Sequence, residues 1–191
     1  MKKALEGVVF LDRDGVINVD RTDYVKSWSE FKFLPGVFEA LRLLARNKLR
    51  VVVVTNQSAV NRGLISPDTL EEIHQNMLDR VKGHGGHVKA IYYCPHTPSE
   101  NCDCRKPKPG MVLKAVKDLS IDLADSYFVG DSDKDVELAR SLGLKCVRIS
   151  GGSRHIEPSE NLEWTAERPI LAKRLREAVD HILRDLKKSP H

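Results

Sequence analysis

The chain has 191 residues, of which 41% are hydrophobic and 30% are charged, as is ordinary for a globular protein. A chain of this length can bury about 70% of its unfolded surface, so we expect one domain over residues 1–191 that needs no disulfides. The net charge of +4 is spread out and aromatic residues make up only 6%, so we expect no nucleic-acid partner. No apolar run approaches the ~20 residues that span a bilayer, and no segment of signal-peptide length follows the first lysines. We therefore expect a cytoplasmic protein without a membrane partner. We also expect a monomer.

The first predicted element is a strand that ends in acidic residues. Val8 to Leu11 are apolar, which is typical of a strand buried on both faces of a parallel sheet. Asp12 and Asp14 follow two positions apart, so both carboxylates can face one small volume. At about 4 Å two such charges repel by roughly 4 kcal/mol at an effective dielectric of 20, so an anionic substrate there requires a cation such as Mg²⁺. The pattern indicates a carboxylate nucleophile with an acid–base partner, and the alternative is a turn whose aspartates are only solvated.

Strands and helices are expected to alternate along the rest of the chain. Residues 18–33 show no sustained period and are interpreted as an irregular flap near the site. Strands are expected at 50–54, 90–93, 127–129 and 145–149, and helices from 36 to about 45, from 66 to about 83, and over 109–119, 133–142 and about 170–187. This alternation predicts a Rossmann-like α/β fold with a parallel sheet, right-handed crossovers and helices on both faces.

Polar residues gather wherever a predicted strand ends. They are Asp12 and Asp14 after the first strand, Thr55 after the second, Arg105 and Lys106 beyond the third, and Asp131 and Asp135 after the fourth. Open parallel sheets bind ligands at the carboxyl ends of their strands. Loop composition alone does not explain the same character at four separate strand ends. We therefore expect these side chains to form one site.

A second constellation follows the third strand. Cys94, His96, Cys102 and Cys104 lie within eleven residues, and thiolates with an imidazole are typical of a closed, structural Zn²⁺ site. A disulfide or a reactive thiol is the alternative, which a reducing compartment disfavours. Ordering about eleven residues costs roughly 11 to 22 kcal/mol, and structural zinc returns an apparent 10 to 16 kcal/mol. The metal is therefore expected to organise the loop 94–104 and to place Arg105 and Lys106.

In their order along the chain these motifs resemble those of the haloacid dehalogenase superfamily. The matching segments are Asp12 to Val16, Thr55, Lys106 and Gly130 to Asp135. The resemblance implies that Asp12 is the nucleophile that becomes phosphorylated, that Asp14 protonates the leaving oxygen and later deprotonates water, and that Thr55 and Lys106 hold the phosphoryl group. It also implies a Mg²⁺ ion bound by Asp12, by Asp131 and by the main-chain carbonyl of Asp14, with Asp135 in support.

The predicted zinc loop is similar to that of one branch of this superfamily, the heptose bisphosphate and histidinol-phosphate phosphatases. Residues 54–58 and 108–111 are more similar to the first group, which implies removal of the 7-phosphate from D-glycero-D-manno-heptose 1,7-bisphosphate in the synthesis of lipopolysaccharide precursors. The five-residue spacer between His96 and Cys102, and Ser132 after Asp131, keep histidinol phosphate as the alternative substrate. The heptose reading implies substrate contacts from Asp20, Tyr24, Asn56, Gln57, Ser58 and Arg105.

Two further classes remain as rivals. A sugar phosphomutase could use the same phosphorylated aspartate, but the intervals around Thr55 leave no room for a large cap domain, and a mutase must exclude water. A non-catalytic, zinc-stabilised binding module is disfavoured because every predicted catalytic position carries a suitable side chain. The expected partner is therefore a small phosphorylated metabolite, with Mg²⁺ and Zn²⁺ as cofactors.

Overall fold

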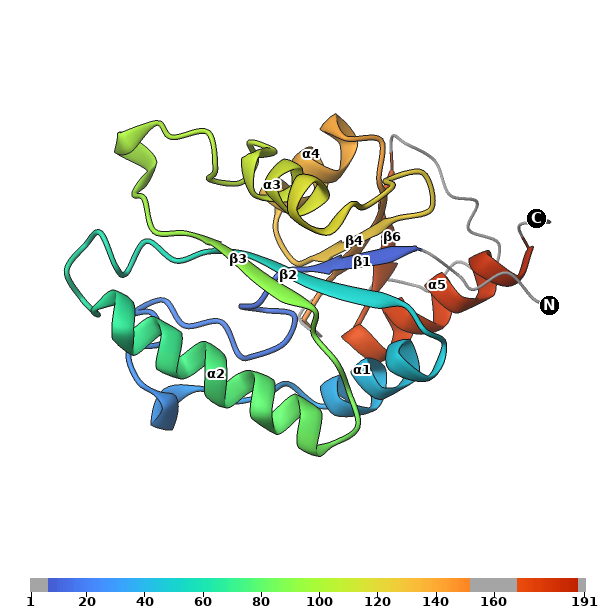
Figure 1. Cartoon of the computed structure of the whole chain (residues 1–191), viewed down its shortest axis with the longest axis horizontal. Coiled ribbons are helices and arrows are strands. Elements are labelled where there is room, and N and C mark those ends of the chain that lie inside the picture. Colours follow the sequence, from blue (N-terminus) through green and yellow to red (C-terminus); the bar gives the residue numbers. More distant parts are fainter. Residues whose placement is uncertain (1–6, 152–167, 189–191) are drawn as a thin grey trace.

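A computed structural model describes residues 7–151 and 168–188 of the chain. Within these ranges, a six-stranded parallel sheet has the order β3-β2-β1-β4-β5-β6 (Figure 1). The strands are β1 (Val8–Leu11), β2 (Arg50–Asn56), β3 (Ala90–Cys94), β4 (Tyr127–Gly130), β5 (Lys145–Ile149) and β6 (Ile170–Ala172). The helices are α1 (Val37–Arg46), α2 (Pro67–Gly83), α3 (Gly110–Leu119), α4 (Asp133–Ser141) and α5 (Leu175–Lys188), with the short 3-10 helices η1 (Trp28–Glu30) and η2 (Pro98–Glu100).

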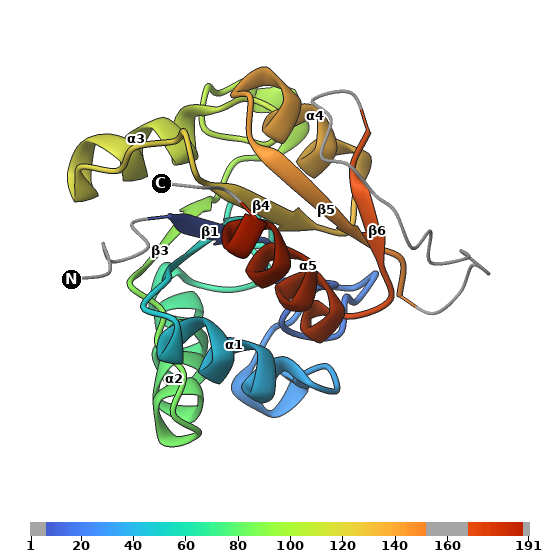
Figure 2. The same cartoon turned by 90° about the vertical axis from the view of Figure 1, so that its right-hand side faces the viewer.

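The helices form a layer on each face of the sheet. Helices α1, α2 and α5 lie on one side, and α3 and α4 lie on the other (Figures 1 and 2). Alternate residues of β1 face opposite layers: Val9 and Leu11 pack with the first, and Val8 and Phe10 with the second. This double burial is why the strand is apolar at every position. The predicted α/β fold with helices on both faces is confirmed.

The C-terminal prediction is wrong at its first residues. Ile170–Ala172 forms β6, which pairs with β5, and the helix begins only at Leu175. The three residues of β6 fit the helical apolar spacing of the segment that follows, so the local pattern did not separate strand from helix. The strand forms because β5 supplies its hydrogen bonds. The predicted domain also includes residues 1–6, 152–167 and 189–191, which lie outside the described residues.

The predicted irregular flap is confirmed between β1 and α1. Apart from η1, residues 18–33 form no helix, and their aromatic rings pack together, with the Trp28 and Phe31 centroids 5.2 Å apart and those of Phe31 and Phe33 5.0 Å apart. In the described part of the chain, neither this segment nor the one between β2 and α2 contains a separate cap domain. None of the helices found in residues 7–151 and 168–188 has the length and apolar character needed to span a membrane.

Candidate active site

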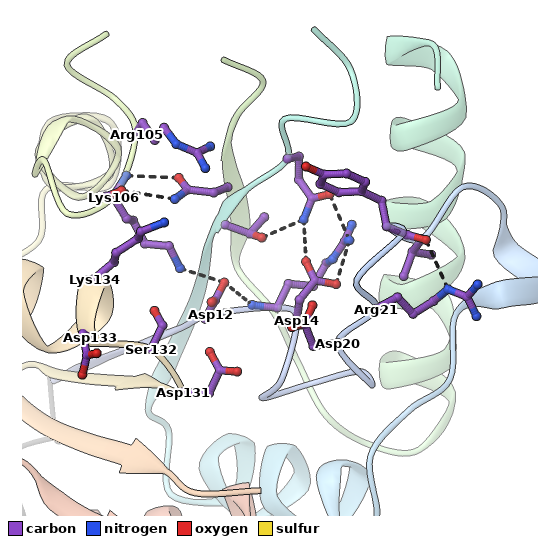
Figure 3. A pocket seen from close by; sticks show the side chains of 16 residues that line it. Asp12, Asp14, Asp20, Arg21, Arg105, Lys106, Asp131, Ser132, Asp133 and Lys134 are labelled. Atoms are coloured by element: carbon purple, nitrogen blue, oxygen red, sulfur yellow. Dashed lines mark hydrogen bonds and ion pairs between the residues drawn. The ribbon is translucent and has the colours of Figure 1, made fainter. Parts of the chain in front are cut away.

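The strand ends converge on one cavity of about 360 Å³. Its walls include Asp12, Thr55, Lys106 and Asp131 (Figure 3), which come from four segments far apart in the sequence. β1, β2 and β4 are neighbours in the sheet and run parallel, so their carboxyl ends lie side by side. The volume is within the range of small-molecule sites, roughly 300 to 1,000 Å³.

Lys106 is a buried cation between two carboxylates. Its Nζ lies 2.8 Å from Asp12 Oδ1 and 2.7 Å from Asp135 Oδ1. Asp135 is fully buried, and its other oxygen accepts hydrogen bonds from the main-chain N–H and the hydroxyl of Ser132 at 3.1 and 2.6 Å. Asp135 therefore completes a capping box with Ser132 at the start of α4 and holds the lysine ammonium beside Asp12.

An acidic cluster lies beside this lysine. Carboxylate oxygens of Asp12, Asp131 and Asp135 all lie within 4.8 Å of one another. Burial, together with the neighbouring carboxylates, raises the pKa of Asp12 to about 7 and that of Asp131 to about 6. Ionised carboxylates that are buried together are costly without a positive charge beside them. Their oxygen atoms are the ligands that a divalent cation such as Mg²⁺ prefers, so the cluster fits such an ion.

Gly15 makes the approach of Asp131 possible. Its φ is +77°, and a Cβ at this position would lie 1.9 Å from Asp131 Oδ2. A side chain is therefore excluded both by backbone conformation and by the carboxylate. The turn after β1 is shaped so that Asp131 can reach the same volume as Asp12.

The carboxylate of Asp14 is held by three side chains that do not belong to the acidic cluster. Oδ1 accepts hydrogen bonds from Arg13 Nη2 at 3.0 Å and Asn18 Nδ2 at 2.8 Å, and Oδ2 accepts one from Gln57 Nε2 at 2.7 Å. Burial alone would raise the pKa of Asp14, but the Arg13 charge and these hydrogen bonds hold it below its usual value. The contact that the resemblance implies between the main-chain carbonyl of Asp14 and a metal stays a prediction.

The four predicted zinc ligands come together in the structure. Cys94 Sγ lies 3.5 Å from His96 Nδ1 and 3.5 Å from Cys102 Sγ, and Cys104 Sγ lies 3.1 to 3.3 Å from the other three ligand atoms. All four cysteines of the chain are free, and these separations exceed the ~2.05 Å of a disulfide bond. The disulfide alternative is thus excluded, and the donor set fits a tetrahedral zinc ion.

This loop is tied to the cavity through Arg105. Its Nη1 donates a hydrogen bond to the main-chain oxygen of His96 at 3.0 Å. Asn56 at the end of β2 fixes the next residue, since its side chain accepts from the Lys106 N–H at 3.1 Å and donates to the Lys106 carbonyl at 3.3 Å. The Cys/His cluster and β2 therefore both determine where Arg105 and Lys106 lie.

Comparison with known proteins agrees with this architecture. A family model described as haloacid dehalogenase-like hydrolase matches residues 2–143, and a related model matches residues 103–187. The chain belongs to the haloacid dehalogenase-like hydrolase family. The family resemblance inferred from the motifs is confirmed.

Similar haloacid dehalogenase-like hydrolases include D-glycero-beta-D-manno-heptose-1,7-bisphosphate 7-phosphatases. The protein of that name from Pasteurella multocida is 38% identical over 188 residues, which cover 92% of this chain and 100% of the relative. The one from Pseudomonas aeruginosa is 42% identical over 145 residues, 76% of this chain and 82% of the relative. The crystal structure of D,D-heptose 1,7-bisphosphate phosphatase from B. bronchiseptica, complexed with magnesium and phosphate, is 34% identical, has a TM-score of 0.82, and matches 94% of this chain and 99% of its own.

The residues predicted to contact the substrate at the end of β2 and just beyond it fall into two groups in this hydrolase. Thr55 and Asn56 line the cavity. Gln57 also borders it but is only 2% exposed, and its amide is engaged internally with Asp14, Thr55 Oγ1 and Arg13. Ser58 is buried, lies 3.4 Å from the Tyr24 hydroxyl, and does not line the cavity. Substrate contacts by Gln57 and Ser58 stay predictions, and the structure gives Gln57 an additional role in holding Asp14.

The rim of the cavity carries charges of both signs. Asp20, Tyr24 and Arg105 line it as predicted, and the flap also contributes Arg21 (Figure 3). Lys134 of α4, which the sequence did not single out, is exposed and lines the cavity near Arg105. The flap and the loop after β3 thus form opposite parts of the entrance.

Three buried polar residues near Asp14 were missed at the sequence level. Arg13, Asn18 and His74 are at most 2% exposed, and all three belong to the hydrogen-bond network around the Asp14 carboxylate. The available signal was an arginine placed between the two aspartates and a histidine within the apolar face of α2. Buried polar side chains require partners, so such positions point to a network.

Proposed function

We propose that this chain is a Mg²⁺-dependent phosphatase that removes the 7-phosphate of D-glycero-D-manno-heptose 1,7-bisphosphate. The observation that carries the proposal is the convergence of Asp12, Lys106 and Asp131 at one cavity. The similarity to named heptose bisphosphate phosphatases supports the substrate class. The roles of the site residues and the resident ions are part of the proposal.

Asp12 acts as the nucleophile. Its carboxylate oxygen attacks phosphorus, the bond to the sugar oxygen breaks, and that oxygen takes a proton from Asp14 as it leaves. Asp14 therefore reacts in its protonated form, which is the minor form at rest because Arg13 and the hydrogen bonds lower its pKa. In the second half, water attacks the phosphoryl group on Asp12 and gives a proton to Asp14, and inorganic phosphate departs with both Asp12 and Asp14 restored. Because Lys106 contacts an oxygen of Asp12, its ammonium also lies where the charge of the phosphoryl oxygens develops.

Two ions complete the proposal. Asp12, Asp131 and the Asp14 carbonyl would hold Mg²⁺, which supplies positive charge beside the transferred phosphoryl group. The Cys94, His96, Cys102 and Cys104 cluster would hold Zn²⁺, which fixes the loop that carries Arg105 and Lys106. Asp135 supports the site by holding Lys106 and does not itself need to touch the ion.

The rim suits a substrate with two phosphate groups. Arg105 and Lys134 bring positive charge to the entrance, where a second phosphate would lie while the first is at Asp12. Histidinol phosphate carries one phosphate and a cationic amine, so this basic side of the rim favours the bisphosphate. Asp20, Tyr24 and Asn56 line the cavity, which supports their proposed hydrogen bonds with sugar hydroxyls.

One sheet and the two helix layers that cover it carry the whole site, which supports a single domain. We propose that this domain acts as a cytoplasmic monomer. Light scattering coupled to gel filtration measures the mass of the particle in solution. A dimer at micromolar concentration would contradict the monomer.

A substrate panel tests the function. Phosphate release with Mg²⁺ is measured on the heptose bisphosphate, histidinol phosphate and p-nitrophenyl phosphate, with Asp12→Asn as the blank, and ³¹P NMR identifies which phosphate remains on the sugar. We expect kcat/KM to be at least about 100-fold higher for the bisphosphate, which corresponds to about 2.7 kcal/mol of transition-state binding. A preference for histidinol phosphate would refute the proposed substrate. If no compound released phosphate, the proposed phosphatase activity would be refuted.

A further inference from the structure

Arg13 is a buried cation whose guanidinium reaches three different acceptors. The residue is 1% exposed. Nη2 donates to Asp14 Oδ1 and to Gln57 Oε1, both at 3.0 Å, and Nη1 lies 3.2 Å from His74 Nε2. Nε has no hydrogen-bond partner among the described residues. His74 is therefore the partner that fixes the Nη1 end of the fork.

His74 occupies a position where an apolar residue would be expected. It lies on the buried face of α2 with Leu70, Ile73, Met77 and Val81, and it is 2% exposed. Arginine has donors only, so the imidazole must accept at Nε2 and carry its proton on Nδ1. Burial and the nearby Arg13 charge lower the pKa of His74 to about 3, which agrees with a neutral ring.

We propose that His74 is a positioning residue that, through Arg13, sets the orientation of the Asp14 carboxylate. This inference rests on the proposed function, in which Asp14 is the proton donor and acceptor. Without an acceptor at residue 74, the buried Nη1 loses its partner, and such a loss is costly. The guanidinium then turns toward other acceptors, and Asp14 Oδ1 loses the fixed donor that holds it.

The role makes a specific kinetic prediction. A sugar phosphate releases a strongly basic alkoxide and needs the proton from Asp14, whereas p-nitrophenyl phosphate releases a stable phenolate that needs none. Since kcat/KM reports the steps up to the first irreversible one, it isolates formation of the phosphorylated Asp12 for both substrates. Misplacing Asp14 lowers kcat/KM for the sugar phosphate selectively, but a general loss of structure lowers both.

The experiment compares His74→Leu with His74→Gln, whose amide oxygen can replace the Nε2 acceptor. General acids contribute about 10²- to 10⁴-fold, so we expect His74→Leu to lose at least about tenfold in kcat/KM on the sugar phosphate and less than about threefold on p-nitrophenyl phosphate. His74→Gln should stay within about threefold of the wild type on both. Ile73→Val is the matched packing control on the same helix face and should show no difference between the substrates.

Arg13→Lys provides a second test should His74→Leu fold poorly. Lysine keeps the charge but not the fork, so the same substrate-dependent loss is expected. Equal losses on both substrates in His74→Leu or in Arg13→Lys would overturn the proposal, as would a His74→Gln variant as impaired as His74→Leu.

An NMR measurement tests the contact without using activity. The ¹⁵N shifts of the His74 ring in the wild-type protein should report the neutral Nδ1–H tautomer from pH 8 to pH 5. A ring protonated at pH 5, or one with its proton on Nε2, would overturn the proposal. If the wild type releases no phosphate from any substrate while this tautomer is found, the proposed phosphatase activity is refuted but the hydrogen bond between Arg13 and His74 is supported.

Discussion

Replacement of Lys106 by methionine tests how the site is held together before a metal binds. At distances of 2.8 and 2.7 Å from Asp12 and Asp135, each attraction amounts to about 6 kcal/mol at an effective dielectric of 20. Burial of the three charged groups offsets most of this sum. Removing only the lysine leaves two buried carboxylates without their cation, which costs about 3 to 5 kcal/mol.

The assay is urea unfolding with Mg²⁺ withheld, applied to the wild type, Lys106→Met, Asp135→Asn and the double variant. Groups in direct contact show interaction energies of about 0.5 to 3 kcal/mol. Because Lys106 and Asp135 are buried, we expect their interaction energy in the upper half of that range. Lys114→Met is the matched control, because Lys114 lies 2.8 Å from Asp118 but is 66% exposed, so its loss should cost less than about 1 kcal/mol. Additive effects at Lys106 and Asp135, or a Lys106→Met cost as small as that of the control, would refute the reasoning.

Three further predictions concern the nucleophile and the two proposed ions. Asp12→Asn should abolish phosphate release and leave the circular dichroism spectrum unchanged, and turnover by this folded variant would contradict the assigned role. Burial raises the pKa of Asp12 from 3.8 to about 7 and that of Asp131 from 3.8 to about 6, so in metal-free protein their contribution to stability is complete below pH 3.8 and is lost as pH rises through these values. Mg²⁺ replaces the protons, so its addition should raise the melting temperature more at pH 8 than at pH 5.5, and equal shifts would count against the site. Removal of zinc with a selective chelator should speed amide exchange over residues 94–104 and reduce activity, and zinc should restore both; full activity in the chelated protein would disprove the coupling to Lys106.

Local patterns were sufficient to bring together the residues that we propose as the reacting groups. Val8 to Leu11 is apolar throughout because helices cover both faces of β1, and Asp12 follows at the strand end where parallel sheets bind ligands. The cysteine and histidine spacing likewise predicted the cluster that the structure assembles. These features follow from residue spacing and from the rule that parallel sheets bind ligands at the carboxyl ends of their strands. They can therefore be predicted from the sequence alone.

Other features depend on contacts between remote segments. Arg13 and His74 are 61 positions apart, and neither residue type indicates by itself that it is buried against the other. The resemblance to heptose phosphatases implied that Gln57 contacts the substrate, and the structure adds a hydrogen bond from its amide to Asp14. β6 has only three residues and exists through its pairing with β5. In each case the deciding partner lies far away in the sequence.

The placement of β1 has a consequence for how this scaffold can change its chemistry. With β2 and β4 on either side and helices above and below, the backbone that carries Asp12 is packed on all four sides, so the position of the proposed nucleophile is fixed by the core. The flap at 18–33 and the loop at 95–109 border the entrance but add no strand to the sheet. Insertions or charge changes in this flap and this loop could therefore admit a different phosphorylated compound without moving the proposed nucleophile.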